Sequence, residues 1–431
     1  MHTSLIKIEQ SKLKITEKIL ALSLYAILLT PFAVGLPFIK GLFDLANKFS
    51  IVHFQRLYFE LVIIVIFYSW FYLKRKNQKA TKFITPLSSS IIIFLSILIV
   101  TALAGDNPAR SFFSTPERQV GVLFYFLLFI YFVALSDAIR CGIINKEKYL
   151  FANVIVATAV AMIGILQCKA SWLINIIYSP LLTILPEVTR PGSVVGNPTF
   201  LSGYLLSAIF MCQYFFIKKK LIPFIILALL VCVYTLFLTQ TRGGIIGLAG
   251  GVCFLIFCFI KEKKIKTSLS IIVATSLFVI LIFGKTDVSE RFNRINIDNN
   301  NRVAQWGIAW KGFKDHPLLG YGPENFVIPM YKYGGDVYLK NHVERIDKPH
   351  NVYIEYLATT GIAGFVAFIT LGITAYRAII PRYKALFGPC LVAYALQCIF
   401  IFDTIIGLLQ LVMLLSLIKS DEKETLCGTC F

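Results

Sequence analysis

The sequence predicts an all-α polytopic membrane protein, and three of its features lead to this prediction. Hydrophobic residues make up 57% of the 431 residues and charged residues only 15%, which is more apolar material than one water-soluble core could bury. Apolar runs of about 20 residues, the length at which a helix crosses a bilayer, recur along the chain. Lysine and arginine gather in alternate connecting segments, as they do in the cytoplasmic loops of membrane proteins.

The apolar runs predict about 12 transmembrane helices. They cover residues 18–39, 56–73, 86–105, 119–136, 148–168, 198–217, 221–239, 243–260, 267–284, 352–376, 384–400 and 401–418. Only Asp403 marks a turn between the last two runs. A further apolar segment, 171–185, is interrupted by Pro180, so we expect it to lie at the membrane interface or to be re-entrant.

The basic residues predict the orientation in the membrane. With the N-terminus in the cytoplasm, 24 of the 42 lysines and arginines fall on the inner side. Ten of the other 18 lie in the long segment 285–350, which the rule for short loops does not count, so the bias is 24 to 8. The net charge of +19 thus reflects topology and contact with membrane lipids, and it does not require nucleic-acid binding because it is spread over separate loops.

The spans and their orientation divide the chain into four parts. Residues 1–284 hold nine transmembrane helices, 285–350 form an extracytoplasmic loop domain, 351–418 hold the last three helices, and 419–431 form a cytoplasmic tail. The N-terminal segment lacks a small-residue cleavage pattern, so we expect it to remain as the first membrane helix. Cys427 and Cys430 have the spacing of a redox or half-zinc motif but stand alone in the tail, so no metal site is expected there.

Four basic residues each precede a span that runs from the outside inward: Arg118, Arg190, Arg242 and His350. Helix N-termini carry unsatisfied N–H groups and partial positive charge, and an added arginine makes such an end a site for phosphate. Each arginine could instead extend to lipid head groups. For Arg118 and Arg190 the two interpretations stay open.

Arg242 gives the most specific of these patterns. It lies in a short turn between two apolar runs, and Gly243 and Gly244 would let the backbone approach an anion closely. Arg190 gains support from a helix start nearby, where Asn197 is expected to cap the helix and Pro198 to occupy its first turn.

The long outer segment has a pattern of its own. Val303, Trp306, Trp310 and Phe313 recur near helical spacing, which predicts an amphipathic helix with Arg302 near its start, lying on the membrane or over a cavity. An aromatic-rich polar region follows, of a kind suited to stacking on sugar rings, although an interfacial aromatic belt explains each tyrosine equally well. Its members are Tyr321, Tyr331, Tyr333, Tyr338 and His342.

His350 lies where this segment ends and the run 352–376 begins. The positive end of that helix disfavours imidazolium, which would keep the ring neutral and able to accept a proton from a hydroxyl. The alternative is a histidine that only caps a helix near head groups. Gly361 and Gly364, about three turns further along, would let another helix or a lipid chain pack closely.

At these residues the chain resembles a known family. His350-Asn351, followed after nine residues by Gly361-Ile362-Ala363-Gly364, is similar to the signature of the O-antigen ligase family and its relatives, the O-antigen polymerases and O-linked oligosaccharyltransferases. The resemblance runs from about Arg190 to Gly364. It includes Gly196-Asn197-Pro198, Gln240-Thr241-Arg242-Gly243, and the spacing of Arg302, Trp306, Trp310, Pro317, Gly320 and Gly322.

The resemblance implies transfer of a glycan from undecaprenyl diphosphate to an acceptor hydroxyl, on the outer face of the bacterial inner membrane, without cofactor, metal or nucleotide sugar. His350 would be the general base, and Arg242 with Arg190 would hold the diphosphate. Arg302 and Arg118 are further candidates for diphosphate binding, with Asn351, Gly243, Gly361 and Gly364 in supporting roles. The acceptor would be lipid A-core, another glycan chain or a protein, and the sequence does not state which.

Two other classes of function stay open. A transporter of lipid-linked glycan would also need many helices and arginines, but it should show internal repeats, and the sequence shows no convincing one. A non-catalytic assembly protein would tolerate any residue at Arg242 and His350. The sequence does not reveal the sugar, the oligomeric state or the type of cell envelope.

Overall fold

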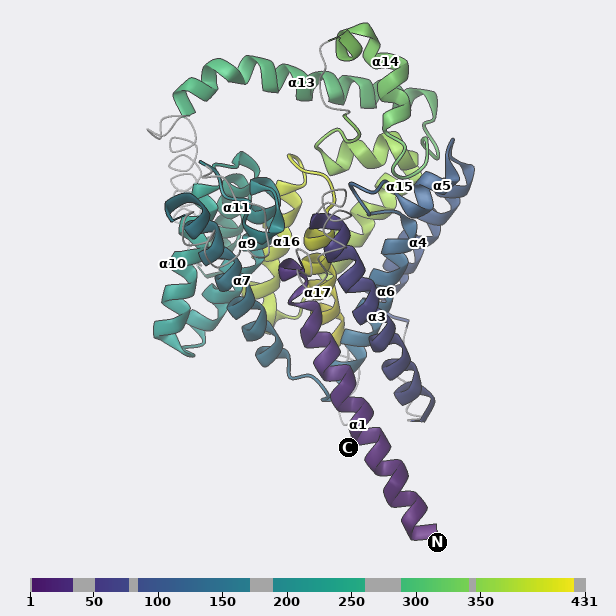
Figure 1. Cartoon of the computed structure of the whole chain (residues 1–431), viewed down its shortest axis with the longest axis vertical. Coiled ribbons are helices and arrows are strands. Elements are labelled where there is room, and N and C mark those ends of the chain that lie inside the picture. Colours follow the sequence, from purple (N-terminus) through teal and green to yellow (C-terminus); the bar gives the residue numbers. More distant parts are fainter. Residues whose placement is uncertain are drawn as a thin grey trace, which may run out of the picture.

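The computed structural model describes residues 2–33, 51–76, 84–170, 189–259, 288–340 and 346–421. These residues form a bundle of helices without strands (Figure 1). The helices are α1 (His2–Ile27), α3 (Ile51–Lys76), α4 (Pro86–Ala104), α5 (Pro108–Phe113), α6 (Val122–Arg140), α7 (Lys146–Lys169), α9 (Pro198–Ile217), α10 (Ile222–Leu238), α11 (Arg242–Phe259), α13 (Val288–Asp315), α14 (Val327–Lys340), α15 (Val352–Arg377), α16 (Lys384–Gln397) and α17 (Ile405–Asp421). Single 3₁₀ turns occur at Thr30–Phe32, Ser193–Val195 and Pro381–Tyr383.

Among the described residues, seven helices are long and apolar enough to cross a membrane: α3, α4, α6, α7, α9, α11 and α15. The apolar helix α10 is slightly shorter. These helices confirm the predicted all-α polytopic membrane fold. The predicted span 267–284, the apolar segment 171–185, His342, and Cys427 with Cys430 all lie outside the described residues.

Two predicted spans differ from the structure at their ends. The first helix begins at His2 and ends at Ile27, whereas the apolar run predicted 18–39. Pro31 follows in a 3₁₀ turn, where it has no N–H with which to continue the helix. The predicted span 401–418 begins later, because residues 401–404 are non-helical and α17 starts at Ile405.

The helix starts near the functional region are defined by their caps. The side chain of Asn197 accepts a hydrogen bond from the backbone N–H of Thr199, and Pro198 is the first residue of α9, as the sequence predicted. Asn351 caps α15 in the same way. Both caps lie next to candidate site residues, so local sequence sets where these helices begin.

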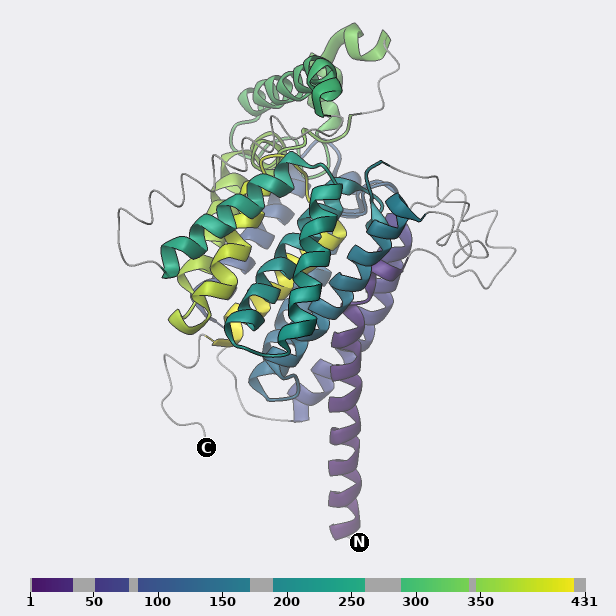
Figure 2. The same cartoon turned by 90° about the vertical axis from the view of Figure 1, so that its left-hand side faces the viewer.

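The helices α13 and α14 cover one end of the bundle, opposite the end where α1 begins (Figure 2). They are attached to it through a small apolar core of their own. That core contains Ile308, Ala309, Phe326, Met330 and Ala358, contributed by α13, the segment before α14, α14 and α15. The long outer segment is thus a packed layer over the start of α15.

Helix α15 is interrupted at Gly361, where φ is 62°. The turn that follows α13 docks at the break. Pro317 accepts a hydrogen bond from the N–H of Ile362 at 2.8 Å, and the N–H of Gly322 donates to the carbonyl of Thr359 at 2.7 Å. The backbone groups freed by the break therefore find partners in the turn.

The glycines of the predicted motif explain this contact. A Cβ atom on Gly361 would lie 2.3 Å from the backbone of Leu318, so a side chain there would displace the turn. Gly364 faces Thr360 of its own helix, where an added Cβ would lie 1.9 Å from the hydroxyl. The sequence predicted that another helix or a lipid chain would pack at these glycines. In the structure, the turn of the outer segment packs at Gly361.

Candidate active site

His350 lies directly before α15, and its backbone is fixed on both sides. Its φ of 54° is in the left-handed region, which is strained for a residue other than glycine. Asn351 accepts hydrogen bonds from the backbone of Tyr353 and Ile354. The N–H of Val352 donates to the carbonyl of Cys398 at 2.9 Å. The histidine is therefore held at the junction of α15 with the segment after α16.

Helix α13 holds the imidazole from the other side. Nδ1 of His350 lies 3.3 Å from Oε1 of Gln305. An amide oxygen accepts hydrogen bonds, so this contact favours the tautomer with its proton on Nδ1, in which Nε2 keeps a lone pair. In the next residue of α13, Nε1 of Trp306 donates to the carbonyl of Pro349 at 3.0 Å. In that tautomer Nε2 is the basic nitrogen.

The surroundings of His350 keep it neutral. Burial, with the positive charges of Arg302 and Arg118, lowers the pKa of its imidazole to about 4, while Asp347 acts in the opposite direction. The sequence predicted a neutral ring because of the positive helix end. In the structure, burial and the two nearby arginines favour the neutral ring.

Arg118 is fixed beside the histidine. Its guanidinium donates two hydrogen bonds of 2.7 Å to the carboxylate of Asp347 and lies 4.4 Å from the centre of the Phe402 ring. The ring of His350 packs edge-on against the same Phe402 at 5.2 Å. Burial alone would raise the pKa of Asp347, but the hydrogen bonds and charge of Arg118 lower it below its usual value.

Arg190 and Arg242 meet at the turn between α10 and α11. Nε of Arg190 donates to the carbonyl of Thr239 at 2.8 Å. The hydroxyl of Thr239 in turn lies 3.0 Å from that of Thr241, and Arg242, with an exposed side chain, begins α11. The structure therefore brings the two predicted diphosphate-binding arginines to one turn.

Gly243 and Gly244 serve close packing of helices in this structure. A Cβ on Gly243 would lie 3.0 Å from Cβ of Phe400, and one on Gly244 would lie 2.7 Å from Cβ of Ser202. Phe400 therefore lies beside Gly243, where the sequence predicted the close approach of an anion. Phe400 and Phe402 belong to one segment, so the segment after α16 contacts Arg118 through Phe402 and packs at Gly243 in α11 through Phe400.

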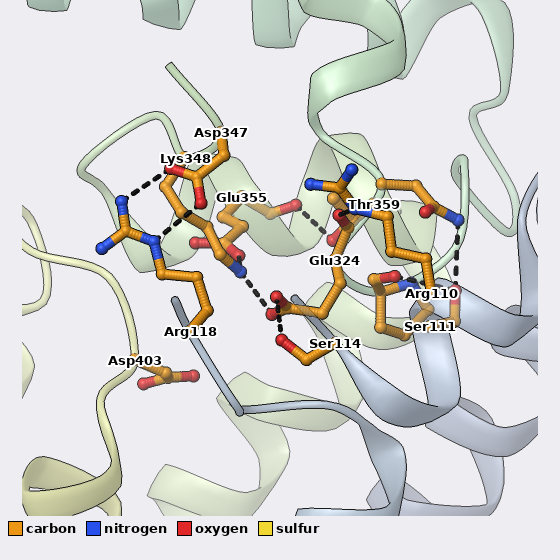
Figure 3. Close-up of polar contacts among 12 residues, drawn as sticks. Arg110, Ser111, Ser114, Arg118, Glu324, Asp347, Lys348, Glu355, Thr359 and Asp403 are labelled. Carbon is orange, nitrogen blue, oxygen red and sulfur yellow. Dashed lines mark hydrogen bonds and ion pairs between the residues drawn. The ribbon is translucent and has the colours of Figure 1, made fainter. Parts of the chain in front are cut away.

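A buried ion cluster lies two residues before the histidine (Figure 3). Nζ of Lys348 lies 2.5 Å from Oε1 of Glu324 and also pairs with Glu355, and the side chain of Lys348 is only 5% exposed. Burial would lower the pKa of Lys348, but the two carboxylates raise it above its usual value. Glu324 also accepts a hydrogen bond of 2.7 Å from the hydroxyl of Ser114. The cluster joins the outer segment, α15 and the end of α5.

The N-terminal half of the chain contributes more to this region than the sequence suggested. Nε of Arg110 donates to the carbonyl of Glu324 at 2.8 Å, and the hydroxyl of Ser111 donates to that of Pro323 at 2.7 Å (Figure 3). The amide of Asn325 donates to the carbonyl of Asn107 at 3.2 Å. Helix α5 thus anchors the outer segment.

Asp403 is the principal residue that sequence reasoning missed. Its carboxylate accepts hydrogen bonds from the hydroxyls of Tyr356 at 2.9 Å, Tyr125 at 3.0 Å and Tyr394 at 3.3 Å. In the sequence, Asp403 was recognised only as the residue that marks a turn between the last two apolar runs. An ionisable residue inside an apolar stretch is itself an indication of a functional site, and it could have drawn attention to this residue.

Two small pockets meet at Asp403. One is lined by Gln55, Glu117, Arg118 and Phe402 among others. The other extends between α9, α16 and α17. Phe402 and Asp403 line both. Arg118 and the ring that contacts His350 therefore border a small open pocket.

The predicted aromatic region divides into packed and exposed rings. Tyr321 is buried, and its hydroxyl donates to Asp315 at 2.8 Å. The hydroxyl of Tyr333 bonds the same carboxylate. Tyr331 is 57% exposed. The side chain of Tyr338 lies outside the described residues. Two of these tyrosines therefore stabilise the α13–α14 layer itself.

Comparison with known proteins finds a family match over the part of the chain that contains Arg242 and His350. Residues 199–369 match the family model described as O-antigen ligase. A protein of Haemophilus influenzae, described as uncharacterized, is 28% identical over 185 residues, which cover 39% of this chain and 46% of the relative. The chain therefore aligns with about half the length of that relative.

The family match overlaps α9, α11 and α15, three of the apolar helices that are long enough to cross a membrane. The matched stretch contains Arg242, Arg302, His350 and the glycine motif at Gly361. Residues 199–369 are therefore similar to the O-antigen ligase family, in agreement with the family resemblance that these motifs indicated.

Proposed function

We propose that this protein transfers a glycan from undecaprenyl diphosphate to an acceptor hydroxyl, with His350 as the general base. The observation that carries the proposal is the imidazole itself. It is held by Gln305 in a contact that favours an unprotonated Nε2, its pKa of about 4 keeps it neutral, and it lies beside arginines and a small pocket at one end of a membrane bundle. A neutral imidazole near an anion site suits the deprotonation of an attacking hydroxyl.

The reaction needs one proton transfer and one displacement. The acceptor oxygen attacks C1 of the sugar as its proton passes to Nε2 of His350, and the bond between C1 and the diphosphate oxygen breaks. Undecaprenyl diphosphate leaves with the bonding electrons. A low pKa returns the proton from His350 to water after each turnover, because imidazolium is disfavoured at this position.

The arginines have different parts in this proposal. Arg242 and Arg190 share the α10–α11 turn and would hold the diphosphate and stabilise the charge that develops on it. Arg302 would act between this site and the histidine. Both guanidinium hydrogen bonds of Arg118 described above go to Asp347, so Arg118 would supply positive charge and position Phe402 more than it would grip phosphate.

The orientation in the membrane is part of the proposal. The start of α1 lies at the end of the bundle opposite α13 and α14 (Figure 1). That opposite end also carries the pair of Lys76 with Glu9 and the pair of Lys146 with Asp421. A cytoplasmic N-terminus and C-terminus would put His350 on the periplasmic or external face of the bacterial inner membrane.

Ligase, polymerase and protein-glycosylating activities share this chemistry and differ only in the acceptor. We favour transfer to a carbohydrate acceptor such as lipid A-core, because the family description names a ligase. A growing glycan chain and a protein hydroxyl are the alternatives. A transporter of lipid-linked glycan would have no need of an oriented neutral base.

A reconstituted transfer assay tests the proposal. Wild type, His350→Ala and Arg242→Ala would be compared with undecaprenyl-diphosphate glycan as donor and with lipid A-core, a glycan chain or a pilin-like protein as acceptor. His350→Ala should lower turnover by about 10²- to 10⁴-fold while donor binding persists. His316→Ala is the matched control, since His316 is an exposed histidine of the same outer segment. Equal release of undecaprenyl diphosphate by all variants would refute the assignment.

A further inference from the structure

The strongest additional feature is one flank of α13. Arg302, Trp306, Trp310 and Phe313 follow one another at spacings of four, four and three residues, so they share one side of the helix. The adjacent face of α13 is buried and holds Gln305, Ile308, Ala309 and Gly312. The flank is therefore presented by a helix whose other side is packed against the protein.

This flank begins at the candidate base. Trp306 donates to the carbonyl of Pro349, directly before His350, and the charge of Arg302 acts on the imidazole. From Trp306 to Phe313 the helix rises by about 10 Å. The aromatic flank thus starts at the reaction centre and leads away from it for a distance longer than one sugar ring.

The far part of the flank is open. Trp310 is 50% exposed, and its ring lies 5.2 Å from that of Phe313, at an angle of 36°. Nζ of Lys314 lies 6.0 Å from the centre of the Trp310 ring. A half-exposed tryptophan on a packed helix offers a rigid apolar face at low entropic cost, and the nearby lysine supplies hydrogen-bond donors.

We propose that Trp306, Trp310 and Phe313 form the binding track for the glycan chain of the lipid-linked donor, with Trp310 as its main stacking ring. The donor is chosen over the acceptor because the flank begins at Arg302, whose charge acts on His350 and which is itself a candidate for diphosphate binding, and the donor's sugars are joined to that diphosphate. The inference rests on the proposed function for the identity of the carrier lipid. It adds that the protein prefers donors with a longer glycan and that α13 makes the contacts responsible for this preference.

Donors that carry glycans of different length can distinguish a glycan-binding role of Trp310 from a general effect on activity. Undecaprenyl diphosphate carrying a single sugar would be compared with the same lipid carrying an oligosaccharide, with one common acceptor. Trp310→Ala should lower kcat/KM for the oligosaccharide donor by about tenfold, mainly through KM, and leave the single-sugar donor unchanged. Trp310→Phe should restore most of the loss because it keeps a ring. Phe113→Ala removes an exposed ring of α5 and should affect neither donor.

The outcomes are distinct. Equal losses with both donors, or the same effect from Phe113→Ala, would overturn the track and point to an aromatic anchor in the lipid head groups. A second measurement stands apart from turnover: binding of the free oligosaccharide to the full-length protein in lipid nanodiscs, by calorimetry. Weaker binding in Trp310→Ala supports the track even if wild type transfers nothing, in which case the proposed function fails. Unchanged binding would overturn the track.

Discussion

The rings of His350 and Phe402 pack edge to face with 5.2 Å between their centres. Phe402 lies in the short segment between α16 and α17, and it also receives the guanidinium of Arg118 at 4.4 Å. One aromatic ring therefore packs between the candidate base and a positive charge that lowers the pKa of that base. The positions of His350 and Arg118 thus depend on an apolar residue.

Removing this ring should impair catalysis more than folding. Phe402→Ala would free the imidazole and Arg118 to move, and small losses of orientation lower rates strongly. We expect kcat to fall by about tenfold or more. Phe402→Tyr, which keeps a ring, should retain most activity. The check is steady-state transfer together with thermal unfolding in detergent, and a variant that loses stability in proportion to activity would contradict a positioning role.

The pH dependence of transfer follows from the pKa of His350. The base acts only when deprotonated, and its pKa is lowered from 6.5 to about 4. The rate should thus be level through neutral pH and fall by half only near pH 4, whereas an ordinary histidine would lose half its activity near 6.5. Arg302→Gln removes a cation that disfavours imidazolium, so the midpoint should move to higher pH. A wild-type midpoint near 6.5 would contradict the burial of the ring.

The buried side chain of Lys348 should contribute to the stability of the protein. Lys348→Met would leave Glu324 and Glu355 buried without their cation, and loss of one partner from a buried ion cluster typically costs about 3–5 kcal/mol. Thermal unfolding measures this loss. Lys332→Met is the matched control and should change stability little, because Lys332 pairs with Asp315 at the surface, where solvent screens the interaction.

A compensating variant separates charge from shape at this cluster. Adding Glu324→Gln and Glu355→Gln to Lys348→Met removes the uncompensated negative charge, so part of the stability should return. If the ion cluster acts only by stabilising the segment before His350, activity should return together with stability. If the triple variant is no more stable than Lys348→Met, the buried charges are not the cause of the loss.

The sequence predicted what is encoded locally. Apolar length located most spans, and Asn197 with Pro198 located the start of α9, because caps and helix periodicity involve neighbours in the chain. The four basic residues were recognised from their positions before spans. That Arg118 lies beside His350 was not predictable, since it depends on how the segment after α16 folds back and puts Phe402 against both side chains.

The same limit explains the other differences. Tyr125, Tyr356 and Tyr394 are 278, 47 and 9 residues from Asp403 along the chain, so their convergence on one carboxylate has no local pattern. Gly361 was recognised as part of a motif, yet the sequence gives no indication that a turn of the outer segment docks there. Long-range packing decides both.

The break in α15 can be tested with two glycines of one helix. Gly361→Ala puts a side chain at a φ of 62° and within 2.3 Å of the Leu318 backbone, so the docked turn must move. Gly372 has nothing within 4 Å of an added Cβ, and alanine in a helix interior is favoured over glycine by about 0.5–1 kcal/mol. Gly372→Ala should therefore stabilise the protein slightly.

The turn leads from α13 to α14 and lies in the layer that orients His350 through Gln305, so its displacement should reach the active site. We expect Gly361→Ala to lower transfer by about tenfold or more and to increase hydrogen exchange at the N–H groups of Gly322 and Ile362, which bridge the break. Gly372→Ala should change neither. Normal transfer in Gly361→Ala, with exchange at Gly322 and Ile362 unaltered, would mean that the docked turn does not hold the catalytic layer in place.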